Sequence, residues 1–170
     1  MPDLNTPDNQ TLFAALYREL RALAERELKR NQGTPLSPTT LIHEAYLGMA
    51  AGAARFEDRA RFMGYAARVM RSLIIDCARE RRALKRGAGF HITQIPADGD
   101  IPLPDDRELV ELADAVDELG SHDPHLAELV DLRYFCGYTL EEIASVQGKS
   151  LRTVQRDWEK ARLILFQQLR

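Results

Sequence analysis

The stretch TLEEIASVQGKSLRTVQRDWEKAR, residues 139–162, decides the fold of this chain. It predicts a short helix, a turn at 148–150 and a longer helix that begins at Leu151. Ser150 is suited to cap the second helix, because its hydroxyl can accept a hydrogen bond from an amide that has no partner within the helix. At 100° per residue, five apolar residues fall on one face, which we expect to be buried: Leu151, Val154, Trp158, Ala161 and Leu165.

The remaining surface of that helix carries polar side chains suited to base edges and phosphates, namely Arg152, Thr153, Gln155, Arg156, Glu159 and Lys160. The pattern predicts a helix-turn-helix whose second helix enters the major groove of DNA. Two amphipathic helices joined by a glycine turn give a weaker version of the same pattern, so a plain helical hairpin is the alternative.

The charge of the chain is unevenly distributed. The formal net charge is −3, but residues 55–86 hold ten basic and four acidic residues, and residues 149–170 hold six basic and two acidic ones. Residues 97–131, which lie between them, hold one arginine and twelve acids. Two positive segments therefore flank an acidic middle, which predicts two separate surfaces for anionic ligands.

Composition excludes several classes of protein. The 170 residues suffice for one ordinary domain or two small ones, and a hydrophobic share of 45% is normal for a soluble globular protein. No apolar run reaches a membrane-spanning length and no signal peptide opens the chain. The two cysteines and four histidines lack metal-ligand spacing. These features predict a cytoplasmic protein without a metal or cofactor.

Helical periodicity recurs along the chain, and no segment shows strand alternation. We expect helices at about 9–31, 38–52, 58–86, 105–119, 123–136, 139–147 and 151–169. Glycine, proline and aspartate between 88 and 104 predict an extended linker. The expected fold is all-α, with two small helical domains at 1–87 and 105–170 on either side of this linker, the second containing the helix-turn-helix.

The expected helix at 58–86 has an apolar stripe and an arginine face. Six arginines are spaced by three, four, seven or eight residues: Arg61, Arg68, Arg71, Arg79, Arg82 and Arg86. Few acids lie between them, so their mutual repulsion favours binding to phosphates over plain solvation. Phe56, Phe62 and Tyr65 would stack on unpaired bases, although the position of Phe62 on the apolar stripe favours a structural role.

With both basic segments placed, the chain resembles the extracytoplasmic-function (ECF) group of sigma-70-type transcription initiation factors. The segments LIHEAYLGMA at 41–50 and RFMGYAARVMRSLIIDCARERRALKR at 61–86 are similar to region 2 of that family, and the final sixty-odd residues are similar to region 4. The resemblance runs from about residue 11 to residue 168. A helix-turn-helix is common to many regulators, but its pairing with the region 2 pattern is specific.

The resemblance implies that the two regions have different functions. Region 2 would bind the clamp helices of the RNA polymerase β′ subunit, through Leu41, Ile42, Glu44 and Tyr46, and would capture the opened −10 element of the promoter. Region 4 would read the −35 element and touch the β-subunit flap. Base edges would then be read by Gln155, Arg156 and Glu159. Arg156 is the strongest candidate for specificity, since a bidentate arginine–guanine pair discriminates by about 1–3 kcal/mol.

One segment departs from the family pattern. Where members commonly carry an acidic cluster just ahead of the run that residues 41–50 match, this chain has Ser37-Pro38-Thr39-Thr40. One interpretation is local: Ser37 caps a helix and Pro38 is its first residue. The other is that a Ser/Thr kinase supplies the missing charge, because a phosphate carries about −1.5 to −2 at pH 7 and would lie at the positive end of a helix. Thr39 and Thr40 rank above Ser37 as phosphorylation sites.

Two other function classes are compatible with parts of the chain. A conventional helix-turn-helix regulator would be dimeric and would bind palindromic DNA unaided, but the arginine-faced helix has no role in it. An enzyme is disfavoured, because no catalytic triad, phosphate loop or complete H-E-x-x-H motif is present. Core RNA polymerase and promoter DNA are thus the expected partners, while the sequence carries no signal that identifies an anti-sigma factor.

Overall fold

The computed structural model describes residues 9–31, 34–51, 56, 58–84 and 105–170. Within these ranges all regular structure is helical, as the sequence predicts. The expected linker at 88–104 and Arg86 lie outside the described residues. No helix in the described part of the chain is long and apolar enough to cross a membrane.

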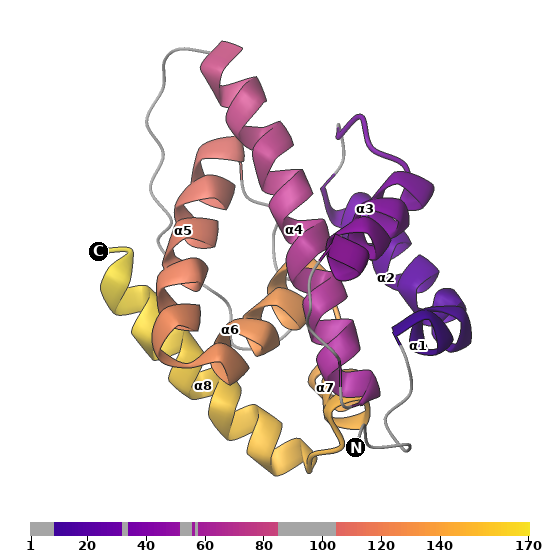
Figure 1. Cartoon of the computed structure of the whole chain (residues 1–170). Coiled ribbons are helices and arrows are strands. Elements are labelled where there is room, and N and C mark those ends of the chain that lie inside the picture. The colour runs from indigo at the N-terminus through magenta and orange to yellow at the C-terminus, as the bar shows by residue number, and fades with distance from the viewer. Residues whose placement is uncertain (1–8, 32–33, 52–55, 57, 85–104) are drawn as a thin grey trace.

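The first half contains four helices: α1 (Asn9–Ala15), α2 (Tyr17–Arg30), α3 (Pro38–Ala51) and α4 (Arg59–Leu84). The single helix expected at 9–31 is interrupted at Leu16, where a turn separates α1 from α2. The long helix α4 runs through the centre of the molecule, with α2 and α3 along one side of it (Figure 1).

The second half contains α5 (Asp106–His122), α6 (Pro124–Val130), the π-helical segment η1 (Asp131–Phe135), α7 (Leu140–Gln147) and α8 (Leu151–Gln168). Capping side chains define the residues at which several of these helices begin. Asp105 with Glu108, and Thr139 with Glu142, form reciprocal capping boxes at α5 and α7. Asp123 caps α6, whose first residue is Pro124.

The two halves pack against each other. Helix α5 lies along α4 on the side opposite α3 (Figure 1), and η1 and α7 also contact α4. Buried apolar residues of both halves form one continuous hydrophobic cluster, with Met70 and Ile74 from α4 and Leu112 and Leu132 from the second half all fully buried. The expected division into two domains at these boundaries stays a prediction.

Candidate nucleic-acid interface

Helix α8 begins after a tight turn. Gly148 ends α7 in the left-handed conformation, with φ of 63°, and an added Cβ there would meet no atom within 4 Å. The Ser150 hydroxyl accepts a hydrogen bond from the Thr153 amide at 3.2 Å, so the cap predicted from the sequence is confirmed. The turn thereby fixes where α8 starts and how it leaves α7.

One face of α8 is buried as expected. Val154, Trp158, Ala161 and Leu165 are each at most 1% exposed, and Leu151 is half-buried. These side chains anchor α8 on α5, α6 and α7. Most polar side chains on the opposite face of α8 are exposed to solvent.

That polar face contains the residues expected to contact DNA. Arg152, Gln155, Arg156, Glu159 and Lys160 are exposed, while Thr153 is half-buried against Ser150. The side chain of Arg156 is 77% exposed and that of Lys160 is 62% exposed. The structure therefore brings all the predicted residues of this helix onto one accessible surface.

Three basic side chains at or near the start of α8 have acidic neighbours at long contact distances. Asp157 lies 3.8 Å from Arg156 Nε and 4.0 Å from Lys149 Nζ, and Lys160 Nζ lies 3.6 Å from Asp123. Lys149, a basic residue of the turn, was not among the predicted site residues. Its position beside the start of α8 could have identified it as a further residue able to contact phosphates.

Glu159 is engaged within α8. Both of its carboxylate oxygens accept hydrogen bonds from Arg162 Nη1, at 2.9 and 3.0 Å. A glutamate held in this way is less available to accept from a cytosine amine than an unpaired one.

The arginines of α4 do not form one uniform exposed stripe. Arg61, Arg68, Arg79 and Arg82 are exposed, and Arg71 is 3% exposed. Arg79 Nη2 lies 2.7 Å from Asp114, and the additional arginine Arg81 lies 2.8 Å from Asp106. Acids of α5 thus occupy part of the face that the sequence assigns to phosphates.

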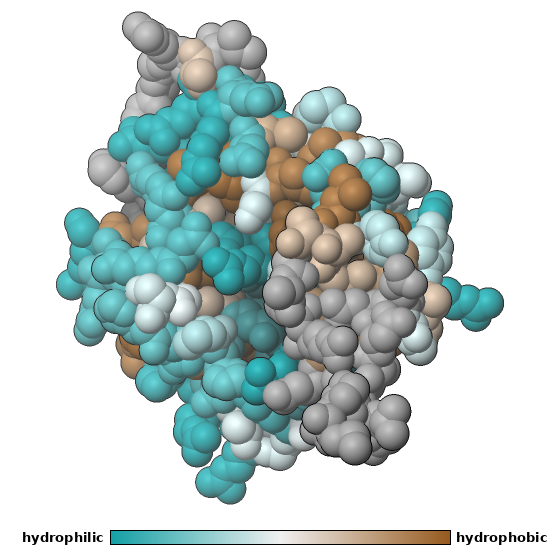
Figure 2. Space-filling model, in the orientation of Figure 1, coloured by the Kyte–Doolittle hydropathy of each residue, from teal (hydrophilic) through white to brown (hydrophobic). Residues whose placement is uncertain are grey.

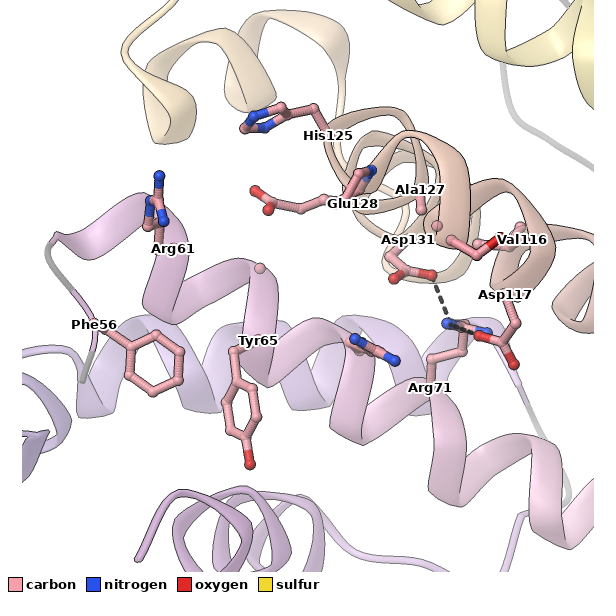
Figure 3. Close-up of a pocket in the computed structure, with 15 residues that line it drawn as sticks. Phe56, Arg61, Tyr65, Arg71, Val116, Asp117, His125, Ala127, Glu128 and Asp131 are labelled. Carbon is pink, nitrogen blue, oxygen red and sulfur yellow. Dashed lines mark hydrogen bonds and ion pairs between the residues drawn. The ribbon is translucent and has the colours of Figure 1, made fainter. Parts of the chain in front are cut away.

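Arg71 lies at the centre of a buried ionic cluster. Its Nε is 2.6 Å from Asp131 Oδ1 of η1, and its Nη2 donates to Asp117 Oδ1 of α5 at 2.8 Å (Figure 3). The Nε contact is an ion pair whose angle is not that of a linear hydrogen bond. Burial raises the pKa of Asp131 to about 7, against the attraction of Arg71.

A second buried carboxyl lies close to this cluster. Glu27 of α2 is fully buried, and burial raises its pKa well above the usual value, with a further contribution from Asp131. The Cys136 thiol approaches Glu27 Oε2 at 3.7 Å. Arg71 attracts both buried carboxyls, but burial outweighs this attraction and raises the pKa of each.

Arginines in the last turns of α2 make further contacts with the second half. Arg26 donates to both oxygens of Glu142 at 2.7 and 2.8 Å and stacks on the Tyr138 ring, while Arg30 donates to the Tyr134 carbonyl. The Arg26 hydrogen bonds lower the pKa of Glu142 to about 2. The acid that caps α7 therefore also attaches the second half to α2.

An open cleft of about 680 Å³ separates the start of α4 from α5 and α6. Arg61, Gly64 and Arg68 line it from α4, and His125 and Glu128 line it from α6. Figure 3 shows His125 and Glu128 reaching towards Arg61 across this cleft. In the view of Figure 2, hydrophilic residues cover most of the side where α5 lies.

The aromatic residues near the start of α4 contact one another. The Phe56 ring lies 5.6 Å from Phe62 and 4.9 Å from Tyr65, between ring centroids. Phe56 and Phe62 are buried and Tyr65 is half-buried. The structural role expected for Phe62 agrees with its exposure of 2%.

The four residues assigned to polymerase contact differ in accessibility. Leu41 and Ile42 are buried in the core, and Glu44 and Tyr46 are half-buried. Leu41 and Ile42 therefore offer no surface to a partner in this structure. The motif-based assignment did not include Leu47, which is an exposed large apolar residue of the same helix.

The hydroxyl cluster lies at the start of α3. The Ser37 hydroxyl accepts a hydrogen bond from the Thr40 amide at 3.1 Å and contacts the Thr40 hydroxyl at 2.9 Å. Thr39 is exposed, and its hydroxyl has no hydrogen-bond partner in the described part of the chain. Capping by Ser37 is thus confirmed, and Thr39 remains accessible.

Among the described residues, no group of three or more His, Cys, Asp or Glu side chains is arranged to hold a metal ion. An all-α protein with an exposed polar helix after a tight turn has one of the arrangements that DNA-binding proteins use. Comparison with known families identifies the particular one: the model described as ECF sigma factor matches residues 5–170, and the chain belongs to that family. Searches of curated proteins and of solved structures each gave no match.

Membership defines the general function. ECF sigma factors initiate transcription as subunits of RNA polymerase, and core polymerase and promoter DNA are their partners. The family is one of transcription factors and not of enzymes.

Proposed function

We propose that this sigma factor reads the −35 element with α8, while the first half binds core polymerase and captures the −10 element with α4. The observation that carries the proposal is the exposed polar face of α8 opposite its buried apolar face. A helix of this kind fits the major groove, where arginine and glutamine side chains distinguish base pairs.

Within α8, Arg156 is the specificity residue of the proposal. Its guanidinium is largely solvent-exposed and has only a long contact to Asp157, so it is available for a bidentate bond to guanine. Arg152 and Lys160 are assigned to phosphates, and Lys149 joins them from the turn. The intrahelical pairing of Glu159 with Arg162 favours a supporting role for that glutamate.

The exposed surface of α3 and α2 is the proposed contact with polymerase. Leu47 and Tyr17 are exposed large apolar residues, with 45% and 42% of their surfaces accessible, and Glu44 and Tyr46 lie on the same helix as Leu47. Exposed apolar groups bordered by polar ones are typical of protein–protein contacts. The buried residues Leu41 and Ile42 would support this surface from within.

The test is transcription by core polymerase with and without the purified chain, on a pool of genomic templates that includes its own operon. We expect new transcript starts that depend on the chain. Identical starts in both reactions would contradict the proposal. A variant with Arg152 and Arg156 both changed to alanine is the control for DNA reading, because both residues are exposed and their loss leaves the core intact.

We further propose that phosphorylation of Thr39 strengthens polymerase binding. The first turn of α3 contains no acidic residue, and added negative charge there would interact favourably with the helix N-terminus by about 0.3–1 kcal/mol. Thr39 is favoured over Thr40, since the Thr40 hydroxyl is already paired with Ser37. A Ser/Thr protein kinase is the partner that this proposal requires.

Core-polymerase affinity, measured for unmodified protein and for protein phosphorylated at Thr39, tests this regulation. We expect tighter binding after phosphorylation and no kinase response in Thr39→Ala, whereas Thr40→Ala keeps the response. Equal affinity of the two forms would leave Ser37-Pro38-Thr39-Thr40 as a helix cap only.

A further inference from the structure

Asp157 lies among the basic side chains in the first half of α8. Its Oδ1 is 3.8 Å from Arg156 Nε, and its Oδ2 is 4.0 Å from Lys149 Nζ in the turn before the helix. The side chain of Asp157 is 25% exposed, whereas that of Arg156 is 77% exposed. One carboxylate therefore lies between the residue proposed to read a base and a residue proposed to contact a phosphate.

The position of Asp157 in the helix gives it no role in capping. Helix α8 begins at Leu151, and the interaction of a charge with a helix N-terminus is confined to the first turn. Ser150 already supplies the cap. Both ion-pair distances are long, and pairs of this kind in contact with solvent contribute little to stability. Stability of the helix therefore does not explain an acid at this position.

The contact at Nε affects how Arg156 presents its guanidinium. A guanidinium donates hydrogen bonds from a planar fork, and a carboxylate beside Nε engages one side of that fork. The two Nη groups remain, and they can donate together to O6 and N7 of guanine. An arginine whose orientation is restricted before it meets DNA loses less side-chain entropy on binding.

The same carboxylate opposes binding to phosphates. Asp157 and Glu159 are the two acids within residues 149–170, and Glu159 is paired with Arg162 in α8. Asp157 instead faces Lys149 and Arg156, so it offsets positive charge on the surface that would meet DNA. Affinity for DNA of any sequence depends on that positive charge. An acid here lowers the affinity of α8 for DNA that lacks the preferred base.

We propose that Asp157 is a positioning residue for DNA reading, which orients Arg156 towards guanine and weakens attachment to other sequences. Both effects raise the ratio of specific to non-specific affinity, and this ratio decides how well a site is found among many competing ones. The inference rests on the proposed function, in which α8 reads the −35 element.

The first measurement uses core polymerase assembled with the full chain, on a promoter library randomised across the −35 element. Asp157→Asn keeps the shape of the side chain and removes its charge. At the position whose base preference depends on Arg156, we expect the preference for guanine to fall roughly three- to tenfold. The matched control is Glu141→Gln on α7, because Glu141 is exposed and has no ion pair among the described residues. Its base preferences should equal those of the parent.

The second measurement is binding of the full chain to a duplex without promoter sequence, at several salt concentrations. Asp157→Asn should bind this duplex roughly two- to fivefold more tightly than the parent. The double variant Arg156→Ala/Asp157→Asn separates the two effects. Relative to Arg156→Ala, it should gain non-specific affinity and lose no further base preference. Thermal unfolding of Asp157→Asn should match that of the parent, since both of its ion pairs are long.

Unchanged base preference in Asp157→Asn would overturn the proposal, and so would unchanged affinity for the duplex without promoter sequence. Failure of the proposed function has a different signature. If Arg156→Ala leaves the −35 preferences unchanged, base reading by Arg156 fails and the role of Asp157 fails with it. If Arg156→Ala changes the preferences and Asp157→Asn does not, only the role of Asp157 fails.

Discussion

Removing the guanidinium at the centre of the buried cluster should destabilise the protein severely. Arg71→Met keeps most of the side-chain volume but leaves Asp131 buried without its 2.6 Å partner and Asp117 without its 2.8 Å donor. The side chains of Arg71 and Asp131 are 4% and 3% exposed, so solvent cannot replace the lost partner. Breaking a buried ion pair from one side costs about 3–5 kcal/mol.

Urea unfolding followed by tryptophan fluorescence measures this loss. Trp158 is the one tryptophan of the chain and lies in the second half, whereas Arg71 lies in the first. With an m-value of about 2 kcal/mol/M, the midpoint should fall by roughly 2 M. Arg68→Met is the matched control, because Arg68 is exposed on the same helix, and it should change the free energy of unfolding by less than about 0.5 kcal/mol.

A double substitution separates the effect of an unpaired buried charge on stability from the effect of altered packing. In Arg71→Met/Asp131→Leu the buried charges of both partners are gone, so much of the lost stability should return. A loss below about 1 kcal/mol in Arg71→Met alone would refute the argument that the cluster depends on this pairing.

Three further predictions concern pH, DNA reading and capping. The folded-state pKa of Asp131 is about 7 and its usual value is 3.8, so the folded protein holds this proton more tightly. The free energy of unfolding should therefore fall as pH rises from about 4 to 7, and Asp131→Asn should flatten this slope in urea titrations; an equally steep slope would assign it to other groups. Arg156→Ala should change which −35 sequences are selected, whereas Lys160→Ala should weaken all of them alike, as sequencing of selected promoters would reveal. Thr139→Ala removes the cap of α7 and should lower thermal stability by about 1 kcal/mol, while Ser145→Ala, on the exposed side of the same helix, should not.

The sequence predicted best those features that depend on interactions between residues close together in the chain. Ser150, Gly148 and the apolar period of α8 act within a few residues of one another, so the end of α7 and the start and buried face of α8 could be predicted from the sequence. The same holds for Ser37 at α3. The interruption at Leu16, the π-helical form of η1 and the extension of α5 to His122 were not predicted.

The sequence could not tell which arginines of α4 remain accessible. Arg71 carries the same charge as Arg68 and lies one turn away, but Asp131, its closest partner, is 60 residues further along the chain. A helical period identifies a face and does not reveal what packs against it. Leu41 and Ile42 were assigned from a family motif, which does not distinguish a residue that touches a partner from one that supports the surface behind it.

The π-helical segment η1 sets the rotation of α7 relative to α6 within the second half. The Cys136 amide donates to the Asp131 carbonyl at 3.0 Å, five residues back, so this turn holds one more residue than an α-helical turn. The wider turn lets both ends of the segment face the first half, Asp131 towards Arg71 and Cys136 towards Glu27. Deleting one residue within 131–135 would turn everything after it by about 100° about the helix axis. Helix α7 would then meet α4 with another side and α8 would lose its fit on α5 and α6, so a single-residue deletion here would act on the whole molecule.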